Sequence, residues 1–260
     1  MNELADGSVS LIGSLSAAIV GAAFGGPEGA IIGAIAGPAV EETGRHVLAN
    51  LLTFRERHRV DTALSAARER VGSLNAEGYR LRADSFWEAR GGFPPPAQEV
   101  LEAVLLAAKR DPEERKAPYL GRMFANIAFD SGISPSAAQW AVTTAETLSW
   151  SQFQLLAVVG RAEQLDLGLI TVGKSGANWD SYALHADLRD LGIANRHLIF
   201  GGTEETWNKI SVPSSALQTF TLGSGGNLLH ALLGLEEIPI DDLHGVVTRL
   251  QAAEPVESSS

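Results

Sequence analysis

The chain has 260 residues, of which 45% are hydrophobic and 20% are charged, so it is long enough to bury a core without covalent staples. It contains no cysteine, which excludes disulfide scaffolds, thiolate zinc sites and cysteine nucleophiles. Its net charge of −11 disfavours a basic nucleic-acid-binding surface, and we expect no nucleic-acid partner.

Residues 1–44 form the first predicted domain, an apolar hairpin rich in glycine. Between Ser8 and Val40 the only charged residue is Glu28. Small residues occupy every fourth position of this stretch: Gly13, Ala17, Gly21, Gly25, Gly29, Gly33 and Gly37. Such spacing lets two helix backbones approach closely, as in glycine zippers that associate in lipid. The run Gly25-Gly26-Pro27 predicts a break between two helices, so a hairpin is favoured over one rod.

The length of this hairpin makes a membrane span marginal. Its first arm, residues 8–25, would extend about 27 Å as a helix, slightly less than the roughly 30 Å of a bilayer's hydrocarbon core. We therefore expect conditional insertion, a re-entrant hairpin or oligomeric packing in contact with membrane lipid. The residues assigned to membrane contact and self-association are Gly13, Gly21, Gly25, Gly29, Gly33 and Gly37. The alternative is a buried Gly/Ala-rich hairpin in a soluble or oligomeric core.

A cluster of arginines follows the hairpin and is interpreted as interfacial: Arg45, Arg55, Arg57 and Arg59. By the positive-inside rule, these side chains would keep the chain that follows in the cytoplasm. The acidic start Met1-Asn2-Glu3 is not typical of a secretory signal. The expected location is therefore the cytoplasm, peripheral to or inserted in the inner membrane, with the soluble domains on the cytoplasmic side.

Residues 45–165 are predicted to form an α-helical bundle. A heptad-like apolar seam marks one long helix or two, with its positions at Val60, Leu64, Ala67, Val71, Leu74, Gly78 and Leu81. The stretch from Gly91 to Pro96 ends this region. Further helices are predicted at residues 97–110, after Asp111-Pro112, after Ser134-Pro135 and after Ser149-Trp150-Ser151-Gln152, the last with capping-box spacing.

Residues 166–251 are predicted to form a small winged-helix-like α+β unit, and residues 252–260 a disordered tail. Short β-like runs at 169–172, 197–200 and 217–222 alternate with helical patterns at 180–191, 227–233 and 240–251. From residue 160 onward the chain has six Lys and Arg against thirteen acids, which disfavours DNA contacts. We expect this unit to dock a protein or to dimerise. The fold class is therefore mainly α, with a zipper hairpin, a bundle and this unit.

One short motif suggests nucleotide binding. Gly168, Gly173, Lys174 and Ser175 formally match the P-loop pattern. A working P-loop needs a strand before it and a helix directly after it, whereas a helix is predicted before this motif and Gly176-Ala177 follows it. The histidines lack metal-ligand spacing, and no serine has a nucleophile-elbow context. We predict no catalytic residue, no metal and no cofactor, and therefore a protein that is not an enzyme.

Several segments follow one another in a recognisable order over most of residues 45–235. They are Arg55-Glu56-Arg57-His58-Arg59, Leu120-Gly121-Arg122-Met123-Phe124-Ala125-Asn126-Ile127-Ala128-Phe129-Asp130, Ser134-Pro135, Leu148-Ser149-Trp150-Ser151-Gln152 and Phe220-Thr221-Leu222-Gly223. This order resembles the bacterial abortive-infection alpha family of phage-defence-associated proteins. The resemblance implies a role in halting infected cells, often beside a membrane, and it carries over no catalytic residue.

These observations lead to one leading expectation and two alternatives. The leading expectation is a bacterial anti-phage effector that associates with or permeabilises the inner membrane through its zipper hairpin and forms homo-oligomers. A protein partner or phage trigger would bind the C-terminal domain. The first alternative is a soluble oligomeric binding or scaffold protein whose hairpin forms the multimer core. The second is a P-loop nucleotide hydrolase.

Overall fold

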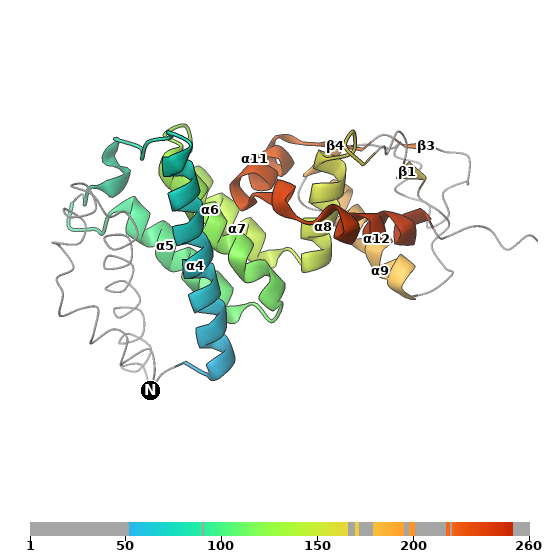
Figure 1. Cartoon of the computed structure of the whole chain (residues 1–260), viewed down its shortest axis with the longest axis horizontal. Coiled ribbons are helices and arrows are strands. Elements are labelled where there is room, and N and C mark those ends of the chain that lie inside the picture. Colours follow the sequence, from blue (N-terminus) through green and yellow to red (C-terminus); the bar gives the residue numbers. More distant parts are fainter. Residues whose placement is uncertain are drawn as a thin grey trace, which may run out of the picture. The chain divides into compact units, whose positions relative to one another are not determined.

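The computed structural model describes residues 52–89, 91–165, 170–171, 179–194, 198–200, 217–218 and 220–251. The described chain is mainly helical, which confirms the predicted class (Figure 1). Within these described residues, no helix combines the length and the apolar character that a membrane crossing requires. The predicted hairpin at 1–44 and the tail at 252–260 lie outside them.

The chain divides into two compact units between Thr147 and Leu148. The sequence pattern suggested a boundary at residues 165/166 instead. The difference arises at helix α8 (Trp150–Gly160), which the sequence pattern groups with the helices before it but which packs against the elements that follow it. Capping signals mark where a helix starts, but they do not show which neighbours its side chains will contact.

The first unit begins with the long helix α4 (Phe54–Ala76), which opens on a capping box. The Thr53 hydroxyl accepts a hydrogen bond from the Glu56 amide at 3.3 Å, and the Glu56 carboxylate accepts one from the Thr53 amide at 2.7 Å. The predicted seam is buried as far as Leu74. Beyond it, Gly78 has a φ of +88°, a left-handed conformation that favours glycine, so the seam does not continue as helix.

Helices α5 (Pro96–Arg110), α6 (Ala117–Phe129) and α7 (Pro135–Thr147) complete the first unit (Figure 1). The short 3₁₀ helix η2 (Glu114–Lys116) precedes α6. Helix α6 packs along α4, and Gly121 is the reason that their backbones approach so closely. A Cβ atom at Gly121 would lie 1.9 Å from the carbonyl oxygen of Ala63.

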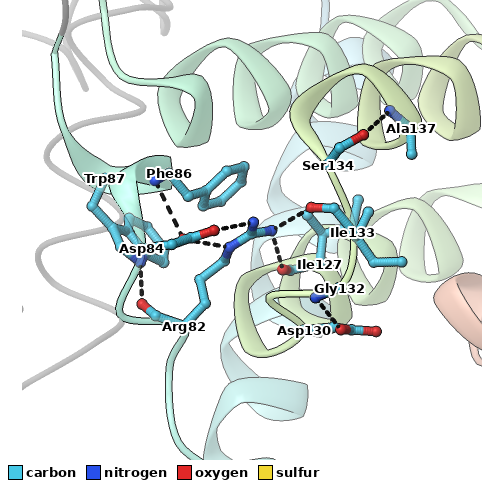
Figure 2. A network of polar contacts seen from close by, with 10 residues as sticks. All are labelled: Arg82, Asp84, Phe86, Trp87, Ile127, Asp130, Gly132, Ile133, Ser134 and Ala137. Carbon is cyan, nitrogen blue, oxygen red and sulfur yellow. Dashed lines mark hydrogen bonds and ion pairs between the residues drawn. The ribbon is translucent and has the colours of Figure 1, made fainter.

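A buried arginine ties the segment after α4 to the loop between α6 and α7 (Figure 2). The Arg82 guanidinium donates to the Asp84 carboxylate at 2.8 and 2.5 Å and to the Ile133 carbonyl at 2.8 Å. Its carbon lies 4.3 Å from the ring centroid of Phe86, in the 3₁₀ helix η1 (Ser85–Trp87). Because Arg82 is 5% exposed and its charge is paired, this cluster is a structural tie.

A second buried charge holds the middle of the first unit. Lys116 is 1% exposed and Asp111 is 6% exposed, and their side chains form an ion pair. The Lys116 ammonium also donates to the Glu146 carbonyl near the end of α7, at 3.3 Å. Asp111 in turn accepts from the Glu113 amide at 2.9 Å. The pair therefore joins the start of α6 to the end of α7.

The second unit is built around α8, which is buried at every residue from Gln152 to Val159. Apart from Gln152 and Gln154 these residues are apolar, and a helix that is buried and largely apolar all round belongs at the centre of a core. The helices that contact it are α9 (Trp179–Arg189), α11 (Ser224–Leu233) and α12 (Ile240–Gln251). The predicted capping box at Ser149 is present, with the Gln152 amide donating to the Ser149 hydroxyl at 3.2 Å.

Helix α9 runs into a π-helical segment, η3 (Asp190–Ala194), while α11 and α12 are joined by the 3₁₀ helix η4 (Leu235–Glu237). Strand β1 (Ile170–Thr171) pairs antiparallel with β3 (Leu217–Gln218), and β2 (Ile199–Phe200) pairs antiparallel with β4 (Thr221–Leu222). The stretch predicted as one strand at 217–222 therefore contributes to two separate pairings.

Candidate interaction groove

An open groove of about 770 Å³ runs between α5 and α7 in the first unit. Its walls combine apolar, acidic and neutral polar side chains from the two helices. The lining residues are Pro96, Glu99, Val100, Glu102, Ala103 and Leu106 from α5, with Pro135, Ser136, Gln139, Trp140, Thr143 and Thr144 from α7. We call this surface the α5–α7 groove. Its volume lies in the range of ligand sites, roughly 300–1,000 Å³, but it is open rather than enclosed.

The sequence of α7 explains why the groove has an aromatic wall. Ala138, Ala141 and Ala145 recur at helical spacing and are all fully buried, so the inner face of α7 is flat. Trp140 does not belong to this alanine stripe and is 42% exposed, although it is among the largest side chains of the helix. A flat inner face lets α7 lie close to the bundle, and the indole remains on the outside, over the groove.

Helix α5 contributes the floor and the charge. Val100 is buried, Ala103 and Leu106 are partly exposed, and these positions follow one another at spacings of three. Glu99 and Glu102 are also three residues apart and therefore lie on neighbouring parts of the same helix face. No Lys or Arg is among the residues that line the groove. The α5–α7 groove is thus an apolar channel with an acidic side.

The environment of Glu102 reflects this unbalanced charge. Partial burial raises the pKa of the Glu102 carboxyl above its usual value, and the negative charge of Glu99 raises it further. Both effects disfavour the ionised form of Glu102. A cation placed beside Glu99 and Glu102 would favour the ionised form of Glu102. The groove therefore favours a positively charged group at this position.

The predicted zipper and nucleotide-binding residues lie outside the described part of the chain. They are Gly13, Gly21, Gly25, Gly29, Gly33, Gly37, Gly168, Gly173, Lys174 and Ser175. Two positions inside the P-loop pattern are described, namely Ile170 and Thr171, and they form β1. In a P-loop such positions belong to the loop whose amides surround phosphate, whereas here they are extended and paired with β3.

The predicted interfacial arginines occupy three different environments at the start of α4, apart from Arg45, which is outside the described residues. Arg55 is exposed and Arg57 is half-buried. Arg59 donates to the carbonyl oxygens of Ala108 at 3.2 Å and Lys109 at 2.6 Å. Because these carbonyls belong to the last turn of α5, the Arg59 guanidinium caps that helix.

The sequence pattern of α7 alone does not predict the groove. The signal that was available is the offset of Trp140 from Ala138, Ala141 and Ala145. An offset of this kind identifies an outer face, but it does not reveal that a neighbouring helix will form a second wall. That requires the packing of α5 against α7, which is a contact between separate helices.

The side chains that line the α5–α7 groove can contribute to binding. No group of three or more His, Asp or Glu side chains in this part of the chain is arranged to hold a metal ion. The groove residues include acids, hydroxyls and an indole, which suit recognition of an amphipathic partner. Comparisons with protein-family models, with curated proteins and with solved structures found no match to this chain.

Proposed function

We propose that this protein is a bacterial anti-phage effector of the abortive-infection type, which acts at the inner membrane through its N-terminal glycine zipper and is not an enzyme. The observation that carries the proposal is the register of Gly13, Ala17, Gly21, Gly25, Gly29, Gly33 and Gly37 in a stretch with a single charge. In water, each glycine costs a helix about 1 kcal/mol relative to alanine. Close packing of helices in lipid needs small residues at this spacing, which would explain why the stretch contains so many glycines.

In this proposal the two described units form the cytoplasmic body of the effector. The second unit serves as a winged-helix-like docking or dimerisation module, a role supported by its short antiparallel pairs set among helices. Its acidic composition favours a protein partner or a phage trigger over nucleic acid. The resemblance to the abortive-infection alpha family supports the same cellular role.

The test is induced expression in bacteria, with cell fractionation and a membrane-potential dye read together. We expect the wild-type chain in the membrane fraction and a loss of membrane potential. The double variant Gly29→Leu/Gly33→Leu should abolish that loss, because two leucines would keep the helix backbones apart. The matched control is Ala30→Leu/Ala34→Leu, which adds leucines at the same spacing but outside the glycine register, and it should remain toxic.

A wild-type chain that leaves the membrane potential unchanged would refute the membrane role. Full recovery in the cytosol as one large assembly would instead support the second candidate, a soluble oligomeric binding or scaffold protein. The specific observation in favour of that candidate is the α5–α7 groove, because an open groove with an exposed Trp140 is typical of a protein-binding surface. Nothing in the described residues favours the nucleotide hydrolase.

A further inference from the structure

We infer that the α5–α7 groove binds an amphipathic helix of another protein, one that presents Lys or Arg beside its apolar residues. The inference concerns a surface of the first unit alone. It does not depend on the membrane role proposed above, and its test uses purified protein without lipid.

The shape of the groove fits a helix. From Pro96 to Leu106 the lining residues of α5 extend over about 15 Å, the length of roughly three helical turns. A docked helix of that length presents apolar side chains at positions i, i+3 or i+4, and i+7, which is the usual form of helix-in-groove recognition. Because the channel is open along its length, it suits a row of side chains better than an enclosed small molecule.

Trp140 gives the groove a binding anchor. Its indole is 42% exposed on the α7 side, facing the channel whose floor includes Val100 and Leu106. Tryptophan is enriched among the residues that contribute most to binding at protein interfaces, because it buries a large area with few rotatable bonds. Gln139 and Thr143 stand beside it and can form hydrogen bonds at the edge of a docked helix.

The charge of the groove determines the kind of helix. Glu99 and Glu102 lie side by side and no basic residue lines the channel, so an incoming Lys or Arg would meet two carboxylates. Partial burial and the charge of Glu99 raise the pKa of Glu102, so a cation beside it would favour its ionised form. Partial burial strengthens a charge-assisted hydrogen bond relative to one in open water.

Three other occupants fit the groove less well. An anionic membrane surface would bring negative charge against Glu99 and Glu102. A second copy of this chain carries a net charge of −11 and so complements Glu99 and Glu102 less well than a cationic helix does. The chain's own residues 8–40 carry only Glu28, which is acidic. A cationic helix from a different protein is the occupant that satisfies both the apolar floor and the carboxylates.

The experiment measures binding of two labelled peptides to the full-length protein by fluorescence anisotropy. One peptide of about four helical turns carries Leu on one face and Lys on the other, and its counterpart has Glu in place of every Lys. We expect the Leu/Lys peptide to bind and the Leu/Glu peptide to bind at least tenfold more weakly. Added salt should weaken binding of the Leu/Lys peptide, because the charges at the groove edge become screened.

Variants of the groove make the result specific. Glu99→Lys/Glu102→Lys should weaken the Leu/Lys peptide at least tenfold and strengthen the Leu/Glu peptide, and this gain shows that the variant is folded. Trp140→Ala should weaken the Leu/Lys peptide about tenfold or more. Asp61→Lys/Glu69→Lys makes the same charge change at exposed positions of α4 outside the groove, and it is the matched control.

Two results would overturn the inference. One is equal affinity of the wild-type protein for the two peptides, or no binding of either. The other is a Leu/Lys affinity that falls equally in Glu99→Lys/Glu102→Lys and in the α4 control, because net charge alone would then explain the attraction. Neither result bears on the membrane-potential experiment, so the two proposals can fail separately.

Discussion

The two units of this chain solve the problem of a helical core in different ways. In the first unit, α4 and α6 pack closely and buried charges join their ends to neighbouring segments, as Lys116 and Asp111 do. In the second unit, a single helix, α8, is buried at every residue from Gln152 to Val159, and apart from Gln152 and Gln154 these residues are apolar. The α5–α7 groove lies on the first unit, between two helices that also pack against each other.

The largest loss of stability confined to one unit should come from breaking the buried Lys116–Asp111 ion pair of the first unit. Replacing Lys116 by Met leaves the Asp111 carboxylate buried without its cation, which typically costs about 3–5 kcal/mol. We expect hydrogen exchange in α6 and α7 to accelerate accordingly, while exchange in α8 changes little. Arg115→Met alters the exposed neighbouring residue and should stay within about 0.5 kcal/mol of the wild type. Equal effects of the two substitutions would show that the pair is not a structural tie.

The next largest loss of stability should come from disturbing the close packing of α4 and α6. Replacing glycine by alanine at a crowded position and at an open position tests it. At Gly121 a Cβ would meet the Ala63 carbonyl oxygen at 1.9 Å, so Gly121→Ala forces two helix backbones apart. We expect a loss of about 3 kcal/mol, at the upper end of overpacking.

At Gly72, on α4, a Cβ would meet nothing within 4 Å. Gly72→Ala should therefore stabilise the unit by up to about 1 kcal/mol. Thermal and denaturant unfolding measure both, and equal signs would contradict the account.

The same comparison in the second unit should give a smaller loss. A Cβ at Gly226 would lie 2.0 Å from the Leu198 carbonyl oxygen. Leu198 precedes a two-residue strand rather than lying in a long helix, so it can shift more easily than Ala63. We expect Gly226→Ala to cost roughly 1–2 kcal/mol, measured by hydrogen exchange in α11. Gly245→Ala on α12, where a Cβ has open space, is the control and should be neutral or slightly stabilising. A larger loss at Gly226 than at Gly121 would reverse the contrast between the units.

Local signals in the sequence predicted the helices of both units, for reasons that the structure makes plain. The capping box at Ser149 and the Ser134 cap depend only on residues within one helical turn, and both are present. The seam predicted from Val60 to Leu81 is buried in α4 as far as Leu74, because its period reflects a single buried face, and the helix ends before Gly78. Predictions failed where a distant partner decides, as at residues 217–222, whose two ends pair with different strands.

The candidate site could not be predicted for a related reason. The groove exists because α5 and α7 are neighbours, and no spacing within either helix encodes that neighbour. Arg59 illustrates the same limit: its position beside Arg55 and Arg57 predicts an interfacial role, and it does not reveal that the guanidinium caps the last turn of α5. A charged side chain can serve solvent, lipid or a helix end, and only the three-dimensional contacts distinguish these roles.

The smallest expected effect belongs to the second unit and depends on pH. The ring of His230 lies against α8 at Gly160, and its Nε2 atom is buried without a hydrogen-bond partner. Burial lowers the pKa of His230, the charge of Arg161 lowers it further, and Glu236 acts in the opposite direction. In the unfolded chain the His230 imidazole is protonated near pH 6.5, whereas in the folded chain it stays neutral at that pH. The free energy of unfolding therefore falls as the pH is lowered through that value.

The substitution His230→Leu removes the titrating imidazole and keeps an apolar side chain against Gly160. We expect the unfolding temperature of the wild type to fall more steeply between about pH 7 and pH 5 than that of His230→Leu. His244→Leu, at an exposed position of α12, is the control and should retain the wild-type slope. If the unfolding temperatures of both variants fall with pH as steeply as that of the wild type, protonation of His230 does not destabilise the second unit at acid pH. If only His230→Leu has the flatter pH dependence, the acid sensitivity of the second unit comes from this buried imidazole, which lies near the buried Arg161 guanidinium and has no hydrogen-bond partner at Nε2.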